Sequence, residues 1–450
     1  MTAEGLESLA RKVIQMALDS GATAAECTVS EGNQFSVNVR KGEVETLTEA
    51  GSRGTGVRVL VDHNTGSAYT SDLTAEGIRK MVDSALQLAK ITTADPYAGL
   101  PSPEELGKVT ADLQLYSPLV AELTTEWKIE QARRAEAAAF AVDPRILNSE
   151  GASFDTHTGQ TVFANSLGFV GSYRTSSCSI SAVPVAHLDG SMERDYWYSV
   201  ARVPDQLDDP DTVGRRAAER ALRRLGARKV PTQKVPVIFE PRVARSLIDN
   251  IFDAVSGDSI YRGESFLAEK LGQQVASTKL TLIDDATIPG LFGSTPFDDE
   301  GVPSRRTVVI EKGILRSWLL NSYTARKLGL RTTGNASRGI TGNAGVGNGN
   351  LFFEAGDQSA EDIIASVKNG FYVTELIGFG VNTVTGDYSR GAAGLWIENG
   401  RLSFPVSEVT IAGTLQEMLM GIEAIGSDLE FRSSMASPTL MIREMTVSGQ

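Results

Sequence analysis

The feature that most constrains the fold is a change of sequence pattern after Gly226. Before it, stretches with helical spacing of apolar residues alternate with strand-like segments, whereas after it short apolar runs are separated by glycine-rich turns. A single core stops growing at roughly 250–300 residues, so a chain of 450 residues needs more than one core. We therefore predict an N-terminal domain over residues 1–226 and a C-terminal domain over residues 227–450.

The N-terminal part shows one order of elements twice. Helices around Leu6–Met16 and from about Thr74 to Ala89 enclose strand-like segments, and a linker follows at Pro96–Pro103. After the linker, helices at Thr125–Ala141 and Asp211–Leu225 enclose a second set of strands. These strands are expected at Ile146–Phe154, Thr161–Asn165, Val170–Ser176 and Cys178–His187. Helix, strands and helix, twice over, predict one layered α/β domain of two related halves.

The C-terminal part contains many short strand-like runs separated by turn signals. Examples of these runs are Lys279–Ile283, Thr307–Glu311, Gly394–Glu398 and Ser407–Ile411. Short helices are expected between the runs, at Pro241–Ala254, Ser322–Leu328 and Ala360–Lys368. Many short strands with glycine-rich turns are typical of a barrel or a sandwich. We predict a strand-rich, barrel-like domain with short helices, and an α+β fold for the whole chain.

The net charge and the cysteine content of the chain limit which partners and which cellular compartment we expect. The formal net charge of -13 argues against a nucleic-acid partner, because phosphate binding needs clustered lysine and arginine. The one basic run, Arg215–Arg228, is expected to be a solvated helix face. No stretch approaches the roughly 20 apolar residues that span a bilayer, and the N-terminus lacks the apolar segment of a signal peptide. We expect a cytoplasmic protein without a membrane partner, with Cys27 and Cys178 as buried free thiols.

The residues that the chain lacks are as informative as those it has. Its three histidines are His63, His157 and His187, and no cysteine follows Cys178. The part of the chain beyond residue 187 therefore has neither imidazole nor thiol, the usual zinc ligands, and cannot by itself form a Ser/His/Asp or Cys/His centre. We expect His63 in a hairpin turn, His157 in the loop Asp155–Gly159 and His187 at a strand end, without a catalytic role.

Carboxylates and glycines are the remaining candidates. The paired acids Asp284-Asp285 and Asp298-Asp299-Glu300 could bind Ca²⁺ or Mg²⁺ or act as acid and base, but each precedes a turn-like glycine or proline. A role in turns is therefore the favoured interpretation. The segment Gly329–Asn350 holds seven glycines in 22 residues and no phosphate-binding motif. It is either a functional loop that approaches a ligand or another chain closely, or an irregular connection.

Several segments, taken in their order and spacing, resemble the TldD/PmbA family, also described as modulators of DNA gyrase. In the N-terminal half they are Gly54–Val59, Ala68–Leu73 and Asp95–Tyr97. In the C-terminal half they are Lys229–Thr232, Ser265–Ala268, Phe297–Gly301, Thr333–Ala336, Thr385–Gly391 and Gly394–Gly400. The resemblance covers nearly the full length and is closer to the PmbA/TldE branch than to the TldD branch.

The resemblance implies that the metal site of the family is degenerate here. In the TldD branch, zinc is held by an HExxxH motif and by a cysteine near the C-terminus. The matching stretch of this chain places Phe239 and Ala244 at the histidine positions and keeps only Glu240, and Ser427–Pro438 offers no cysteine. We therefore expect no catalytic residue, no metal and no other cofactor in this chain, and zinc only in a TldD-like partner. Glu240 is expected to be an acid at a helix N-terminus, where the helix dipole favours it.

The resemblance further implies a heterodimer with a TldD-like paralogue that carries HExxxH. Such pairs enclose an active site that trims unfolded peptides, including leader peptides, and this chain is then inactive alone. An extended peptide in that site is expected to add as a strand to a sheet edge. The candidate residues that line the substrate chamber are Thr333, Gly334, Asn335, Gly386, Asp387, Tyr388 and Arg390.

Two other functions compete with this interpretation. One is a self-sufficient hydrolase that uses carboxylates and a metal held without histidine or cysteine. The other is a homodimeric peptide-binding or regulatory protein, of the kind that the gyrase-modulator description suggests, without peptidase activity. A paralogue with HExxxH in the same genome favours the heterodimer, whereas its absence favours the homodimer.

Overall fold

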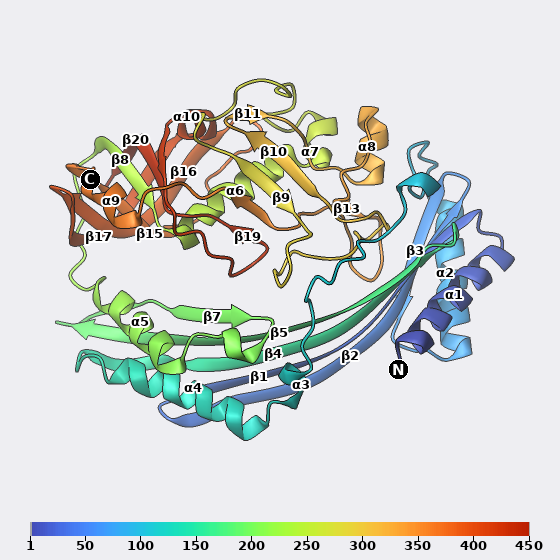
Figure 1. Cartoon of the computed structure of the whole chain (residues 1–450), viewed down its shortest axis with the longest axis horizontal. Coiled ribbons are helices and arrows are strands. Elements are labelled where there is room, and N and C mark those ends of the chain that lie inside the picture. The colour runs from blue at the N-terminus through green and yellow to red at the C-terminus, as the bar shows by residue number, and fades with distance from the viewer. Residues whose placement is uncertain (1, 450) are drawn as a thin grey trace.

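The computed structural model describes residues 2–449, and its N-terminal part is one curved antiparallel sheet of seven strands. The strand order is β3-β2-β1-β4-β5-β6, with β7 beside β5. The strands are β1 (Ala24–Arg40), β2 (Glu43–Val61), β3 (Asn64–Thr70), β4 (Ile146–Asn165), β5 (Val170–Leu188), β6 (Ser191–Arg194) and β7 (Trp197–Ala201). The helices are α1 (Ala3–Asp19), α2 (Ala75–Ile91), α3 (Leu119–Glu122), α4 (Thr125–Phe140) and α5 (Pro210–Leu222). Figure 1 shows α1, α2, α4 and α5 on the convex face, and the C-terminal domain over the concave face.

The two predicted halves meet at the central strand pair β1–β4, which runs antiparallel with Gly32 opposite Gly159. Alternate residues of β1 point to the helices, and they divide between two cores. Val29 packs with the helices of the first half, α1 and α2, whereas Val37 packs with α4 and α5 of the second half. The order helix, strands and helix therefore occurs twice in one layered domain, as predicted.

The predicted strand boundaries in the second half were wrong. Residues 146–165 form a single strand, β4, and residues 170–188 form another, β5. His157 therefore lies within β4, opposite Gln34 and Ser177, and not in a loop. The polar, glycine-containing middle of β4 has little strand propensity of its own, but β1 and β5 flank it on both sides, and this pairing outweighs local preference.

The C-terminal part contains a closed five-stranded barrel. Its strands are β8 (Gln233–Phe239), β15 (Asn369–Ile377), β16 (Asp387–Glu398), β17 (Arg401–Thr414) and β20 (Leu440–Ser448), and the pairing of β17 with β20 closes it. A second sheet has the order β11-β10-β9-β14-β19. Its strands are β9 (Leu282–Asp285), β10 (Arg306–Glu311), β11 (Ile314–Leu315), β14 (Leu351–Phe353) and β19 (Met435–Ala436). The predicted strand-rich, barrel-like domain is confirmed.

Short helices and strands complete this domain. They are α6 (Pro241–Val255), α7 (Gly257–Arg262), α8 (Ser322–Leu328), α9 (Ala360–Ala365), α10 (Leu415–Met420), β12 (Ala336–Ser337), β13 (Gly345–Val346) and β18 (Ile422–Ile425). One large core joins α6 to the barrel and the second sheet. Within residues 2–449, no helix has both the length and the apolar character needed to cross a membrane. Cys27 and Cys178 are buried free thiols, as predicted.

The glycine-rich segment Gly329–Asn350 joins the two domains. Arg338 from this segment donates to Glu26 of β1 at 2.9 Å, and Arg58 of β2 donates to the same carboxylate at 2.7 Å. Glu26 is 1% exposed, so this pairing is sealed from water. The next part of the segment lies directly on β2, where a side chain at Gly56 would place its Cβ 1.7 Å from the Ile340 carbonyl oxygen. The segment is therefore a contact between domains and not a plain connection.

This close approach gives a test of the domain contact. Gly56→Ala is expected to lower the free energy of unfolding by about 1–3 kcal/mol, because the added methyl group overpacks a backbone contact. Gly339→Ala is the matched control, since a Cβ at Gly339 meets no atom within 4 Å. Urea unfolding followed by tryptophan fluorescence measures both. Equal midpoints for the two variants would show that the contact does not hold the domains together.

Candidate functional site

The residues expected at degenerate metal positions lie where β8 leads into α6. Phe239 is the last residue of β8 and Ala244 lies in the second turn of α6, and both side chains are fully buried in the apolar core. Neither side chain has a lone pair to offer a metal ion. Glu240, between them, is the N-cap residue of α6 and is 4% exposed.

Both carboxylate oxygens of Glu240 are occupied by arginines from the other domain. The Arg220 guanidinium donates to Oε1 at 2.7 Å and to Oε2 at 3.1 Å, and Arg223 donates to Oε2 at 3.2 Å. The Glu240 side chain accepts no hydrogen bond from the first turn of α6. The expectation that Glu240 serves the helix dipole is therefore corrected: its main partners are two guanidinium groups across the domain interface. A bidentate pair between an arginine and a carboxylate is among the strongest hydrogen-bonded contacts in proteins.

The basic run that supplies these arginines is not a solvated helix face, contrary to expectation. Arg215 and Arg216 are exposed, but Arg220 is buried and both Arg223 and Arg224 are half-buried. Burial alone lowers the pKa of Arg220, but Glu240 and Asp195 outweigh it, so that its pKa rises above the ordinary value. Buried charges of this kind are tolerated only when they are paired. The end of α5 is therefore part of the domain interface, where acids from both domains neutralise it.

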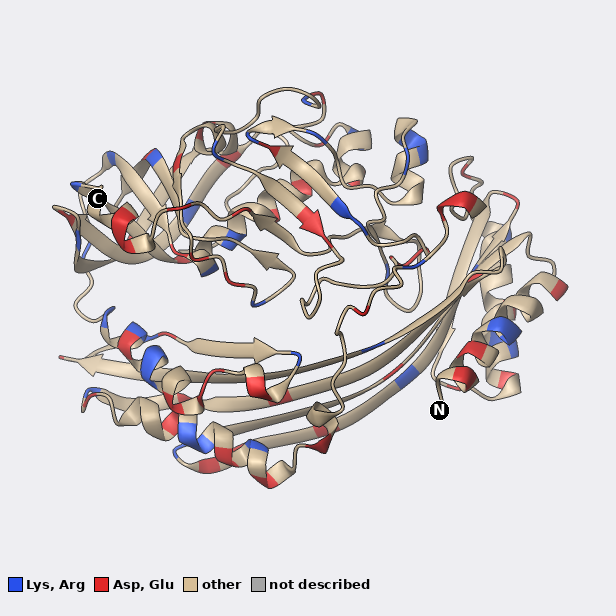
Figure 2. Cartoon of the chain, viewed as in Figure 1, with Lys and Arg blue, Asp and Glu red and all other residues tan. Residues whose placement is uncertain are grey.

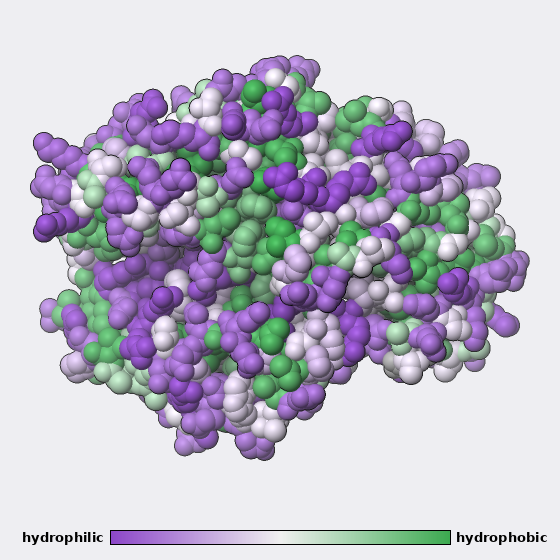
Figure 3. Space-filling model, in the orientation of Figure 1, coloured by the Kyte–Doolittle hydropathy of each residue, from purple (hydrophilic) through white to green (hydrophobic). Residues whose placement is uncertain are grey.

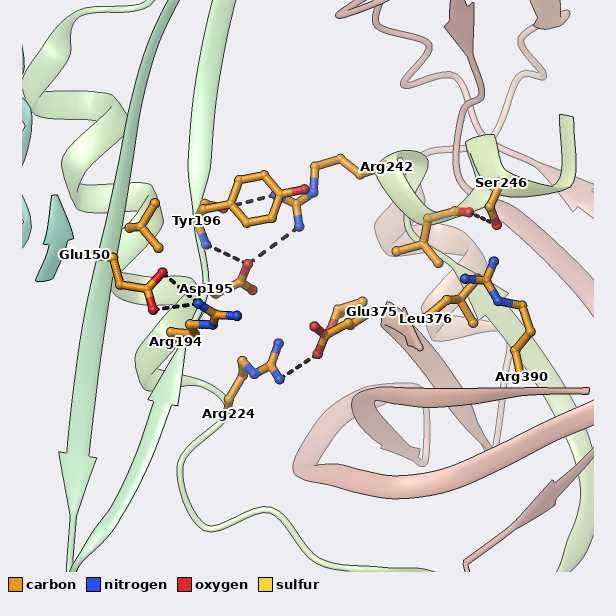
Figure 4. Close-up of a pocket in the computed structure, with 13 residues that line it drawn as sticks. Glu150, Arg194, Asp195, Tyr196, Arg224, Arg242, Ser246, Glu375, Leu376 and Arg390 are labelled. Carbon is orange, nitrogen blue, oxygen red and sulfur yellow. Dashed lines mark hydrogen bonds and ion pairs between the residues drawn. The ribbon is translucent and has the colours of Figure 1, made fainter. Parts of the chain in front are cut away.

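A cleft of about 530 Å³ opens beside this ion-pair cluster. It is lined from both domains by four arginines, three acids and a few apolar side chains, as the close-up shows (Figure 4). The space-filling view shows a hollow between the two domains with largely hydrophilic walls (Figure 3). The charged lining residues are Arg194, Arg224, Arg242, Arg390, Glu150, Asp195 and Glu375.

The charges in the cleft are arranged as pairs. Arg194 contacts Glu150 at 2.5 Å, and Arg224 contacts Glu375 of β15 at 2.6 Å. Arg242 of α6 lies 3.6 Å from Asp195, with its guanidinium 4.3 Å from the centre of the Tyr196 ring. Figure 2 shows that Lys, Arg, Asp and Glu are otherwise frequent on the helices of the convex face and sparse along the long strands. The sequence interpretation missed Asp195, Arg242 and Glu375, for which the basic run was the only available signal.

This lining does not fit zinc. A zinc site needs imidazole, thiolate or carboxylate ligands that surround a position where the ion fits. Phe239 and Ala244 offer none, Glu240 is held by Arg220, and the guanidinium groups nearby repel a cation. Among residues 2–449 there is no group of three or more His, Cys, Asp and Glu side chains placed to hold a metal ion. The cleft can bind and orient an anionic or polar group, but its residues supply no metal-activated water.

The proposed chamber residues do not form one group. Asn335 donates to Asp284 at 2.7 Å, and with Gly334 it lines a separate cavity of about 150 Å³. Thr333 lies beside them and donates to Asn335 at 2.6 Å. Arg390 instead lines the cleft between the domains. The two family segments therefore lie at different places in the C-terminal domain.

The other three candidates lie around the turn into β16. Tyr388 is buried in the barrel core, and Asp387 is exposed and accepts from the Thr385 hydroxyl at 2.6 Å. Gly386 has φ +88°, and a Cβ there would lie 1.9 Å from the Gln416 side chain. The positive φ and this close approach both favour glycine at position 386. A bulky replacement would therefore disturb the local fold as well as any substrate chamber nearby.

The paired acids behave mainly as structural groups. Asp298 accepts from the backbone amides of Glu300, Val302 and Ala336 at 2.9–3.0 Å, which confirms its role in a turn. Asp285 accepts in the same way from Thr287 at 2.9 Å. Asp284 differs, because it is 2% exposed, and burial raises its pKa to about 6 although Asn335 donates to it.

The raised pKa of Asp284 predicts a dependence of stability on pH. The unfolded chain releases this proton near the ordinary value of 3.8, whereas the folded chain keeps it until about pH 6. Stability is therefore lost as pH rises between these values, by at most about 1.4 kcal/mol per pH unit. Urea unfolding at several pH values between 4 and 7 should show this loss, and Asp284→Asn should reduce it. The exposed Asp357→Asn is the control, and identical slopes for both variants would contradict the assignment.

Comparison with known proteins adds a family context to this geometry. Three family profiles match in order: PmbA/TldA metallopeptidase domain 1 at residues 25–89, the central domain at 118–225 and the C-terminal domain at 232–449. The metalloprotease PmbA of Escherichia coli O157:H7 is 40% identical over 98% of this chain and 97% of its own length.

Solved structures give the same context. A putative modulator of DNA gyrase from Bacteroides thetaiotaomicron has a TM-score of 0.93 at 29% identity, with full coverage of both chains. TldE from Thermococcus kodakarensis has a TM-score of 0.87 at 21% identity, covering 98% of this chain and 100% of its own, and shares the fold.

Proposed function

Because the chain belongs to the PmbA/TldA metallopeptidase family, we propose that it is the non-catalytic, metal-free subunit of a two-chain metallopeptidase. Its partner in this proposal is a TldD-like paralogue, which supplies the HExxxH motif and the zinc ion. The substrate is an unfolded peptide, such as a leader peptide, and nucleic acid and membrane have no part. Two buried free thiols suit a reducing compartment, so we place the protein in the cytoplasm.

The observation that carries this proposal is the state of Glu240. A general base on zinc-bound water needs a carboxylate that is free to accept a proton at the metal. Here Arg220 engages both oxygens of that carboxylate, and the flanking positions are core residues. Glu240 stands at the position of the general base of the catalytic branch, but in this chain its carboxylate forms an ion pair between the two domains.

The contribution of this subunit is then structural. Arg220 and Arg223 fix the end of α5 against the start of α6, and Arg338 fixes the glycine-rich segment against β1. Two such links hold the concave sheet at a set position over the barrel domain. A rigid pair of domains presents a constant surface to the partner and to the peptide, which is how positioning lowers the entropic cost of a reaction.

A second candidate function has one observation in its favour. The Bacteroides thetaiotaomicron structure, with which this chain shares its fold over the full length, is described as a putative modulator of DNA gyrase. In that alternative, the chain pairs with itself and binds peptides or a target protein without cleaving them. The cleft, whose lining is rich in arginines and acids, is compatible with either role.

Reconstitution tests the proposal. The chain and the HExxxH paralogue from the same genome are purified separately and together, and each sample is assayed on an unstructured fluorogenic peptide and for zinc content. We expect cleavage only by the pair, with about one zinc ion per pair and none in this chain. A variant of the paralogue with Gln in place of its motif Glu is the control and should be inactive. Peptidase activity or stoichiometric zinc in this chain alone would overturn the proposal, and an inactive pair with a stable homodimer would favour the alternative.

A further inference from the structure

We propose that the cleft between the domains binds the C-terminal carboxylate of an extended peptide, with Arg390 as its main anchor. The inference rests on the proposed role in peptide handling and gives the cleft a specific ligand chemistry. Its starting point is the charge balance of the lining residues. Four arginines face three acids, so one positive charge remains after each acid is matched with an arginine.

Arg390 of β16 is the arginine that remains. Glu150 pairs with Arg194 and Glu375 pairs with Arg224. Arg242 lies 3.4 Å from Glu240 and 3.6 Å from Asp195, so it also has acidic partners. Within residues 2–449, Arg390 has no acidic oxygen within 4.0 Å, and its buried Nε atom has no hydrogen-bond partner. Asp249 and Tyr388 interact with Arg390 electrostatically, and the Tyr388 hydroxyl also lies within hydrogen-bonding range of its guanidinium, but neither forms an ion pair with it. A buried donor without a partner is costly, and a ligand carboxylate removes that cost.

The start of α6 adds a second positive contribution. Arg242, Val243 and Ser246 of this helix line the cleft, so the positive end of the helix dipole faces the same space. The Glu240 carboxylate accepts no hydrogen bond from the first turn of α6, and the arginines Arg220 and Arg223 balance its charge. Arg242 is itself fixed, since its Nη1 donates to the Tyr196 carbonyl at 3.0 Å. An anion in the cleft therefore meets oriented donors that need no rearrangement.

The form of the cleft favours a peptide carboxylate over a phosphate. A planar carboxylate matches the fork of a guanidinium group and carries one charge, which equals the excess charge of the lining. Val183, Val243 and Leu376 give the cleft apolar walls for the terminal side chain. Directly after Leu376, the β15–β16 hairpin exposes Ile377 by 55% and Phe379 fully, which offers apolar surface to the preceding residues of a peptide. A volume of about 530 Å³ suits a ligand of that size.

The test compares two probes on the full chain. One is an N-terminally fluorescein-labelled pentapeptide ending in a free leucine carboxylate, and the other is the same peptide with a C-terminal amide. Fluorescence anisotropy should show binding at least about tenfold tighter for the free acid, because the amide loses a charge-assisted contact. Inorganic phosphate serves as a competitor, and it should displace the acid only weakly.

Variants locate the contact. Arg390→Leu should reduce the affinity for the free acid by about tenfold and leave the affinity for the amide unchanged. Arg401→Leu, an exposed arginine at the distal end of the β16–β17 hairpin, is the matched control and should bind both peptides normally. Arg390→Gln removes the charge but keeps a polar side chain, so it provides a second variant with the same expected loss if the leucine variant does not fold.

Three results would overturn the inference: equal affinity for the acid and the amide, normal acid binding by a folded Arg390 variant, or displacement of the acid by phosphate at low concentration. The last result would identify a general anion site. Because binding is measured on this chain alone, without turnover, a failure here is distinct from a failure of the reconstituted peptidase.

Discussion

The pairing of Glu240 with Arg220 is the interaction on which the arrangement of this molecule depends. It joins the N-cap residue of α6 to the end of α5, and thereby one domain to the other. Both side chains are more than nine-tenths buried, so neither can lose its partner without leaving an uncompensated charge. Breaking such a pair costs on the order of 3–5 kcal/mol, although forming it contributes less than that. The cleft takes its walls from the two domains that this pair holds together.

Under the proposed non-catalytic role, the same pairing gives Glu240 a structural function that needs no metal. Phe239 and Ala244, which the resemblance places at the histidine positions of the family motif, belong to the apolar core, and Glu240 between them forms ion pairs at the domain interface. The Glu240 carboxylate lies opposite the basic run at the end of α5, where it neutralises the arginines Arg220 and Arg223. A retained motif glutamate is therefore no evidence of retained catalysis, because buried arginines can keep it for structural reasons.

Much of this could be predicted from the sequence, and the errors have physical causes. Helical spacing placed α2, α4, α6 and α8 within a few residues, and the repeated order of elements predicted the two halves of the N-terminal sheet. The long strands β4 and β5 were divided in two because pairing with neighbours, and not local propensity, makes their polar middles extended. Arg220 was taken for a solvated residue because its partners, Glu240 and Asp195, come from other elements. The candidate residues Asn335 and Arg390 were grouped by family segment, whereas the fold places them in different cavities.

The most direct test of the central claim is Glu240→Gln in the reconstituted pair with the HExxxH paralogue. Turnover of an unstructured peptide is measured per folded complex, with the unfolding midpoint of the same sample. If Glu240 is a structural link, the midpoint falls because Arg220 loses its charged partner, while turnover per folded complex stays within about threefold. Loss of turnover in a complex that remains folded and paired would show instead that this glutamate takes part in catalysis.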